Sequence, residues 1–247
     1  MKRLIGKVAV ITGATGGLGS AIAHAFAAEG VRVAVGFHRS EEAANALVAA
    51  LPGSGHFAVN LPVTATDAVN AASQRVKVVA GRCDILVNCA GTTRFVAHAD
   101  LDALDDELID QIFATNVRGA IACVRAFRPL LAENGDGIIV NISSIAGVTA
   151  NGSNIAYCAS KAALDNLTKS MARALAPAIR VVSVSPGLID TEFVQGLDQT
   201  WRGQQVAKTP LNRLASPEEI ARAVLATLTH LTFTTGAVIP VDGGRPL

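Results

Sequence analysis

The sequence is poor in aromatic residues and in charges, and its cysteines and histidines form no metal-binding pattern. Aromatic residues make up 4% and charged residues 17% of the 247 positions, and the formal net charge is +1. This balance gives no electrostatic footprint for a nucleic acid or a membrane surface. The four cysteines lack zinc-type spacing and the five histidines do not cluster, so we expect no metal site and buried, unreactive thiols.

The chain also lacks a clear membrane span or signal peptide. An uncharged stretch, residues 8–28, is long enough to cross a bilayer, but four glycines interrupt it, which favours strand, turn and helix. The first apolar run is broken by Gly6 and Lys7 and shows no cleavage-like site. We therefore expect a cytoplasmic protein, and 50% hydrophobic residues suffice for a large core.

What the sequence does contain is a single tyrosine, Tyr157, at helical spacing from a lysine. Tyr157 lies four residues before Lys161 and thirteen after Ser144, so the tyrosine and lysine would share one helix face. A phenol titrates near 10, but a positive charge about 4 Å away, at an effective dielectric of about 20, is worth roughly 4 kcal/mol or about three pKa units. Ser144 follows an apolar run and could donate a hydrogen bond to a carbonyl group. Without a cofactor site, however, the same spacing fits an ordinary surface pair.

A glycine-rich turn predicts a site for the pyrophosphate of a dinucleotide. The apolar run Val8–Ile11 leads into residues 12–19 and then into a helical stretch, residues 20–29. At such a turn, backbone N–H groups and the helix dipole face the anion, and glycine lets the ligand approach. The glycines fit two fingerprint spacings: Gly13, Gly17 and Gly19, or Gly13, Gly16 and Gly19.

Short apolar runs alternate with helical stretches along the chain. The expected strands are residues 7–11, 31–36, 57–60, 84–88, 137–142, 180–185 and 238–241. This alternation predicts an α/β fold, a doubly wound parallel sheet of about seven strands with helices on both faces and ligands at the carboxyl ends of the strands. No linker or repeat divides the chain, so residues 1–247 are expected to form a single domain.

Together these features resemble the short-chain dehydrogenase/reductase family in its single-domain form, and are similar to its 3-oxoacyl-[acyl-carrier-protein] reductases. The matching segments are residues 12–19, Asn88 to Gly91, Asn116, Ser144, Tyr157 with Lys161, Pro186-Gly187 with Thr191, and residues 241–244. The resemblance implies a Rossmann-type NAD(P)-binding oxidoreductase. It also implies a small-molecule carbonyl or alcohol substrate and a homotetramer or homodimer.

The resemblance implies a role for each catalytic residue. Tyr157 would give a proton to the carbonyl oxygen, or remove it in the alcohol direction, and Lys161 would lower the tyrosine pKa and hold the nicotinamide ribose. Ser144 would fix the carbonyl, and Asn116 would position a water that links Lys161 to solvent. Ser143 is the neighbouring competitor, but the thirteen-residue interval to Tyr157 selects Ser144.

The end of the second strand favours NADP over NAD. An acid there would bind the adenosine ribose, but no acid occurs before Glu41, and Arg39 is suited to the 2′-phosphate. Alternatively, Arg39 is merely solvated and Ser40 caps the next helix. Relatives that prefer NADP often carry a basic residue just before the middle glycine of the turn, where this chain has Gly16.

The remaining cofactor contacts also follow from the resemblance. Asn60 stands where the family has an acid near the adenine, and Cys89 where it has a second asparagine. Residues 189–208, which include Trp201, would form a lid. The full expected cofactor set is Gly13, Thr15, Gly17, Leu18, Gly19, His38, Arg39, Ser40, Asn60, Leu61, Asn88, Ala90, Gly91, Tyr157, Lys161, Pro186, Gly187, Ile189 and Thr191.

For the reaction, we expect reduction of a ketone to a secondary alcohol and its reverse, with 3-oxoacyl thioesters first and small free alcohols or ketones second. Residues 133–137 include two acids and would repel an acidic carrier protein. Arg94 and His98 are the candidates for binding an anionic group. Two other classes stay open, a cofactor-sensing regulatory protein and a sugar-nucleotide epimerase or dehydratase.

Overall fold

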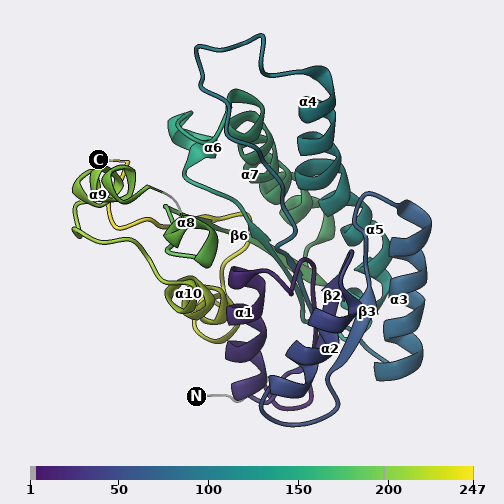
Figure 1. Cartoon of the computed structure of the whole chain (residues 1–247). Helices are drawn as coiled ribbons and strands as arrows, with labels where there is room; N and C mark the ends of the chain where they lie inside the picture. Colours follow the sequence, from purple (N-terminus) through teal and green to yellow (C-terminus); the bar gives the residue numbers. More distant parts are fainter. Residues whose placement is uncertain (1–3, 197, 247) are drawn as a thin grey trace.

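The structure, a computed structural model, describes residues 4–196 and 198–246 and contains a parallel seven-stranded sheet (Figure 1). The strands lie in the order β3-β2-β1-β4-β5-β6-β7. Their bounds are β1 (Val8–Ile11), β2 (Arg32–Phe37), β3 (Phe57–Asn60), β4 (Ile85–Asn88), β5 (Gly137–Ile142), β6 (Ile179–Pro186) and β7 (Val238–Val241). The predicted doubly wound sheet is confirmed, and each strand begins and ends within one residue of its expected bounds.

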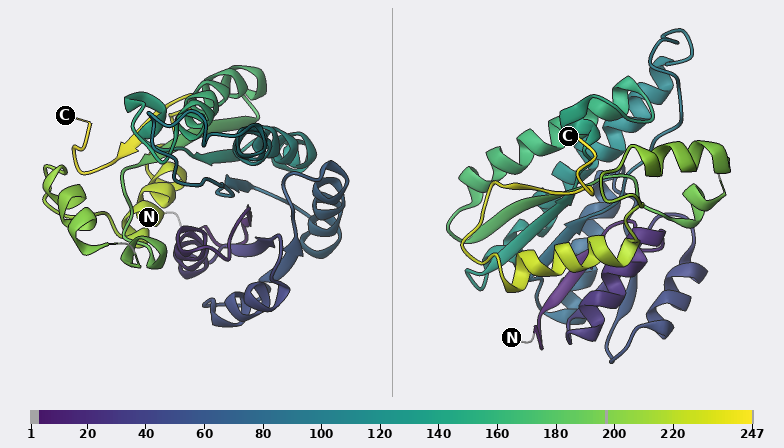
Figure 2. Two further views of the ribbon diagram at one scale, coloured as in Figure 1. Left: turned by 45° about the horizontal axis from the view of Figure 1, so that its top comes forward. Right: turned by 90° about the vertical axis from the view of Figure 1, so that its left-hand side faces the viewer.

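Helices cover both faces of the sheet (Figure 2). Helices α1, α2 and α10 pack on one face, and α3, α5 and α7 on the other. The helices are α1 (Gly17–Ala28), α2 (Glu41–Ala50), α3 (Thr66–Ala80), α4 (Asp106–Phe113), the π-helix η1 (Ala114–Arg118), α5 (Gly119–Ala132), α6 (Ala146–Thr149), α7 (Ile155–Leu175), α8 (Glu192–Gln195), α9 (Gln199–Ala207) and α10 (Pro217–Thr229). Within residues 4–196 and 198–246, no helix has the length and apolar character to cross a membrane.

The strands are apolar along their length because both of their faces are covered. Ile11 belongs to the cluster under α1 and α10, whereas its neighbour Val10 belongs to the cluster under α3 and α5. Successive residues of a strand point to opposite faces, so a strand buried on both sides shows no polar alternation. Phe26 and Phe127 fill the two clusters and are fully buried, which stabilises the fold by about 1.5–3 kcal/mol each.

The order of the strands decides where a ligand can bind. Strand β1 lies between β2 and β4, so the chain crosses from one half of the sheet to the other between β3 and β4. Open α/β sheets bind ligands beyond the carboxyl ends of their strands at such a switch point. The glycine turn follows β1, and Asn88 and Ser144 lie at or just beyond the carboxyl ends of β4 and β5.

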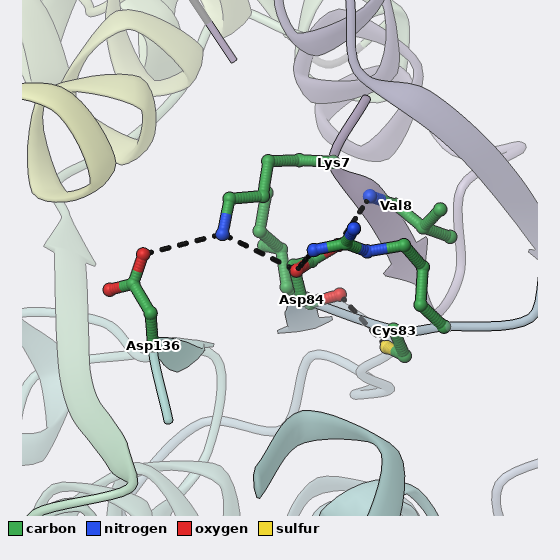
Figure 3. A network of polar contacts seen from close by, with 7 residues as sticks. Lys7, Val8, Cys83, Asp84 and Asp136 are labelled. Atoms are coloured by element: carbon green, nitrogen blue, oxygen red, sulfur yellow. Dashed lines mark hydrogen bonds and ion pairs between the residues drawn. The ribbon is translucent and has the colours of Figure 1, made fainter. Parts of the chain in front are cut away.

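At the opposite edge of the sheet, Asp84 joins the starts of β1 and β4 (Figure 3). Its buried carboxylate accepts hydrogen bonds from the Val8 amide at 2.8 Å and from the Arg82 guanidinium at 2.6 and 2.9 Å. The Lys7 ammonium lies 3.3 Å from both Asp84 and Asp136. Burial acts to raise the pKa of Asp84, but the bonds from Arg82 and Val8 and the charge of Lys7 hold it below its usual value.

Asp84→Ala should destabilise the protein by about 2–4 kcal/mol, because the Val8 amide and the Arg82 guanidinium lose their acceptor and Lys7 keeps only the exposed Asp136. The lowered pKa means that Asp84 stabilises the fold fully above about pH 4 and less as the pH falls through its pKa in the folded state. Urea unfolding at pH 7 and pH 3 measures both effects, and the difference between wild type and variant should shrink at pH 3.

The matched control is Asp136→Ala, which removes an exposed partner of Lys7 and should cost less than about 1 kcal/mol. Equal losses in the two variants would contradict the central role of Asp84.

Candidate active site

Glycines shape the turn between β1 and α1. Gly13 has a φ of 62°, and a Cβ there would lie 2.9 Å from the Ala90 Cα, whereas a Cβ on Gly19 would collide with the Gly13 carbonyl oxygen. Helix α1 begins at Gly17, three residues earlier than predicted, and no side chain caps its amino end. The exposed residues of the turn, Thr15 to Gly17, therefore lead to free N–H donors and the positive end of the helix dipole.

Thr12 ties this turn to the loop that follows β4. Its Oγ1 accepts hydrogen bonds from the amides of Cys89 and Ala90 at 3.0 and 2.9 Å. Asn88 is buried, and its Nδ2 donates to Asn141 Oδ1 of β5 at 2.9 Å. These bonds align the ends of β1, β4 and β5, so the residues predicted from all three strands come together at one edge.

Tyr157 and Lys161 lie one turn apart on α7 at this edge. Tyr157 is half-buried, and the Lys161 Nζ lies 5.6 Å from the centre of its ring. Lys161 is 6% exposed and donates to the Ile142 carbonyl oxygen at the end of β5 at 2.8 Å. A Cβ on Gly91 would lie 3.8 Å from the same Nζ. A buried ammonium group therefore lies between the phenol and the loop after β4.

Ser143 and Ser144 follow β5 and make different contacts. Ser143 is buried and its Oγ donates to the Lys161 carbonyl oxygen at 3.3 Å, so its proton holds α7 to the sheet. Ser144 is half-buried and its Oγ accepts from the Ala146 amide at 3.2 Å. A hydroxyl that accepts one bond still has a proton to donate. Ser144 is thus the serine that can offer a donor to a substrate.

Asn116 lies in η1, the π-helix between α4 and α5. Its Oδ1 accepts from the Thr92 amide at 2.8 Å, and its Nδ2 donates to the Thr92 carbonyl oxygen at 3.1 Å and to Ser160 Oγ at 3.0 Å. Ser160 Oγ in turn donates to the Tyr157 carbonyl oxygen at 2.8 Å. The side chain of Asn116 therefore holds the loop after β4 against α7. π-Helices are rare and often occur at functional sites.

The ends of β2 and β3 carry the residues expected to bind the adenosine. The exposed residues after β2 are His38, Arg39 and Ser40. Ser40 Oγ accepts from the Ala43 amide at 3.1 Å and caps α2, which is the structural role left open for it. Asn60 is exposed at the end of β3, and the Leu61 amide donates to the Phe37 carbonyl oxygen at 2.7 Å. Arg39 and Asn60 thus lie at the carboxyl ends of neighbouring strands.

Comparison with known proteins agrees with this arrangement. A family model described as enoyl-(acyl carrier protein) reductase matches residues 13–245. The 3-oxoacyl-[acyl-carrier-protein] reductase of Thermotoga maritima is 37% identical over 98% of both chains. The 7alpha-hydroxysteroid dehydrogenase of Clostridium sardiniense is 38% identical over 100% of this chain and 96% of its own. A solved short-chain dehydrogenase/reductase structure from Brucella melitensis has a TM-score of 0.90 at 28% identity, covering 98% of both chains.

The chain belongs to the short-chain dehydrogenase/reductase family. It is therefore an NAD(P)-dependent oxidoreductase that acts on CH–OH groups, and the predicted resemblance is confirmed. This finding sets aside the regulatory and epimerase alternatives. The turn fits the dinucleotide cofactor of the family. No side chain caps the backbone N–H groups at the amino end of α1, and Gly13 and Gly19 allow the backbone of the turn to pack closely below this end.

In this dehydrogenase/reductase, the segment after β6 touches the glycine turn. Pro186 ends β6, and the Gly187 amide donates to the Val241 carbonyl oxygen at 3.0 Å. A Cβ on Gly17 would lie 3.7 Å from Thr191 Cγ2, so Thr191 lies beside the open end of α1. The predicted cofactor residues of β6 and of the turn are thus neighbours.

The expected lid, residues 189–208, contains α8 and α9. Ile189 forms an isolated parallel bridge with Ala215, and Asp190 pairs with Arg202 of α9 at 2.6 Å. Trp201 is half-buried in α9, and residue 197 of the lid lies outside the described residues. The bridge ties the start of the segment to Ala215 outside it, and the ion pair joins that start to α9 within the segment.

Arg94 and His98, the residues expected to bind an anionic group, have partners within the protein. The Arg94 guanidinium lies 2.9 Å from the Asp105 carboxylate and donates to the Ala103 carbonyl oxygen at 3.1 Å. His98 Nε2 lies 3.2 Å from the Gly152 carbonyl oxygen. Because Asp105 offsets the charge of Arg94, this loop is a poor site for an anionic substrate group.

The cysteines are weak acids. Burial raises the pKa of Cys89 to about 11 and that of Cys123 to about 12, and it also raises the pKa of Cys158. The reactive form of cysteine is the thiolate. These thiols therefore have little reactivity at neutral pH.

Sequence analysis missed the polar side chains that support the site. Asn141 Nδ2 donates to Thr168 Oγ1 of α7 at 2.9 Å, which joins β5 to the helix of Tyr157. Asn154 contacts both the start of α7 and the loop after β4. Asn141 did carry a signal, because an asparagine inside an apolar strand is costly unless it has hydrogen-bond partners. Asn154 carried none beyond its preference for the start of a helix.

Proposed function

We propose that residues 1–247 form a single NADP-dependent reductase domain that converts a ketone to a secondary alcohol and catalyses the reverse. The observation that carries the proposal is the meeting of Tyr157, the buried Lys161 and Ser144 with the glycine turn at one edge of the sheet. When bound, the cofactor supplies or accepts a hydride at this edge.

In the proposed mechanism, Tyr157 gives its phenolic proton to the carbonyl oxygen of the substrate. The positive charge of Lys161 stabilises the phenolate that remains, and the low dielectric around a buried ammonium strengthens this effect. Ser144 donates to the same carbonyl oxygen and fixes its position. In the alcohol direction, the phenolate removes the proton.

The ammonium group of Lys161 can donate more than one hydrogen bond. It has three protons, and one is bonded to the Ile142 carbonyl oxygen. The other two would serve the nicotinamide ribose and a proton path to solvent through a water held near Asn116. Asn116 and Lys161 both lie close to Gly91. A Cβ built on Gly91 would lie 3.5 Å from Asn116 Oδ1 and 3.8 Å from Lys161 Nζ.

The preference for NADP rests on the charge at the end of β2. Arg39 is exposed there beside His38 and Ser40, and the first acids, Glu41 and Glu42, lie inside the first turn of α2. A guanidinium group can bind a phosphate in two places, whereas an acid would repel it. Asn60 and Leu61 would contact the adenine, and the open end of α1 would hold the pyrophosphate.

The leading substrate is a short 3-oxoacyl thioester on a small thiol. The Thermotoga maritima relative is named for a 3-oxoacyl substrate. The acids before β5 disfavour an acidic carrier protein, although the Lys7 ammonium, 3.3 Å away, offsets part of the charge of Asp136. The second candidate is a free alcohol or ketone with an apolar body, which the hydroxysteroid relative favours.

We also place the enzyme in the cytoplasm and expect a homotetramer or homodimer. Neither nucleic acid nor membrane is an expected partner, because the net charge is only +1.

Tyr157→Phe should lower kcat by at least about 100-fold and leave NADPH binding nearly intact, because the ring still packs but the proton is lost. Steady-state kinetics on a 3-oxoacyl thioester, with NADPH binding by fluorescence as the control, measure both. Activity within tenfold of wild type would contradict the mechanism.

Arg39→Ala should weaken NADPH use about 10- to 100-fold and leave NADH use unchanged, because a charge-assisted bond to phosphate is worth roughly 1.5–3 kcal/mol. The measurement is kcat/KM with each cofactor. If kcat/KM falls by the same factor with NADPH and with NADH, Arg39 has a structural role instead.

The same acyl group should be reduced almost equally well on a small thiol and on an acyl carrier protein. Exposed charges mainly change encounter rates and their salt dependence. A carrier-linked substrate that is at least about 100-fold better at low salt, with the advantage lost at high salt, would overturn this proposal.

A further inference from the structure

The side chain of Asn154 joins the start of α7 to the loop that follows β4. Asn154 is 1% exposed and caps α7, with its Oδ1 accepting from the Tyr157 amide at 2.7 Å. Its Nδ2 donates to the Arg94 carbonyl oxygen at 2.7 Å and to Thr93 Oγ1 at 3.2 Å. One amide group therefore contacts both the main chain of the predicted proton donor and residues 92–98, here called the substrate loop.

Further hydrogen bonds join the substrate loop to Ser153, the residue before Asn154. The Val96 amide donates to the Ser153 carbonyl oxygen at 2.8 Å, and the Thr93 and Ser153 hydroxyls lie 2.5 Å apart. The buried side chain of Val96 packs in a cluster that includes Ala156 and Tyr157. The substrate loop, which rises above the sheet with the segment that leads into α4 (Figure 1), is therefore fastened to the first turn of α7.

An ordinary helix cap does not require an asparagine here. A cap needs only an acceptor for the first amides, and serine, aspartate and asparagine supply it about equally well. The two N–H donors of Asn154 are additional, and both point to the substrate loop. A serine at this position could still cap α7 but would have no N–H groups to donate to the Arg94 carbonyl oxygen and Thr93.

We propose that Asn154 is a positioning residue that sets the distance between the Tyr157 phenol and the substrate loop. Its oxygen fixes Tyr157 at the start of α7, and its nitrogen fixes the loop against which the ketone lies. This inference rests on the proposed function, because it assigns proton transfer to Tyr157.

Two variants separate the role of the Asn154 oxygen, which accepts from the Tyr157 amide, from the role of its nitrogen, which donates to the substrate loop. Asn154→Ser keeps the acceptor and loses both N–H donors, and its shorter hydroxyl, engaged at the Tyr157 amide, does not reach the Arg94 carbonyl oxygen, so the KM for a 3-oxoacyl thioester should rise about tenfold while kcat stays within about threefold. Asn154→Ala loses both, so kcat should also fall about tenfold, because the Tyr157 amide loses the acceptor that fixes the start of α7 and the phenol moves out of position. The KM for NADPH should change less than about twofold in both variants.

The control for a general loss of stability is Ser216→Ala. Ser216 caps α10 through the Glu219 amide at 3.3 Å, and its loss should lower the melting temperature by a similar amount without changing kcat or the ketone KM. If Asn154→Ser and Asn154→Ala match this control in both kinetic constants, Asn154 is only a cap and the proposal is wrong.

Hydrogen exchange distinguishes this proposal from the proposed function. Asn154→Ser should speed exchange at Val96 and spare Tyr157, whereas Asn154→Ala should speed both. A wild-type protein that reduces no ketone would refute the proposed function, while this exchange pattern would still support the link made by Asn154. Unchanged exchange in the substrate loop of both variants would refute that link, whatever the activity.

Discussion

A buried ammonium group is the interaction on which the rest of the site depends. Lys161 is 6% exposed, and removing such a charge from water costs several kcal/mol unless polar groups surround it. The Ile142 carbonyl oxygen, at the end of β5, supplies one partner. Asp165 lies one turn further along α7, where burial raises its pKa and the charge of Lys161 opposes that shift. The helix, the strand end and the loop after β4 must therefore keep a fixed arrangement around one nitrogen atom.

The fold was predictable because its strands are buried on both faces. A run such as Gly137–Ile142 is short, apolar and bounded by turn residues, which identifies a central strand without any long-range information. The glycine turn was equally clear, although the start of α1 was placed three residues late. The error has a physical cause, since Gly17 and Gly19 have low helix propensity and tertiary packing places them in the first turn.

The sequence predicted those site residues whose own side chain would take part in the reaction. It did not predict the contacts that side chains of the site make with distant parts of the chain. Tyr157, Lys161 and Ser144 stand out by type and spacing, and their roles stay predictions that the geometry permits. The contacts of Asn154 and Asn116 with the loop after β4 join residues that are far apart in sequence. No local pattern encodes such a bond, because it depends on how two loops meet after the sheet has formed.

The π-helix η1 lies between α4 and α5 in one continuous helical segment and changes the directions in which their side chains face. An extra residue in a turn rotates the helix before it by roughly 100° relative to the helix after it. Leu108 and Ile112 of α4 can thus face Val96 and the start of α7, while Phe127 of α5 faces the sheet. The chain obtains two differently aimed apolar surfaces without a loop between them. If the same residues formed a regular α-turn instead, the two surfaces would be rotated by roughly 100° relative to one another, and one of them would then point toward solvent.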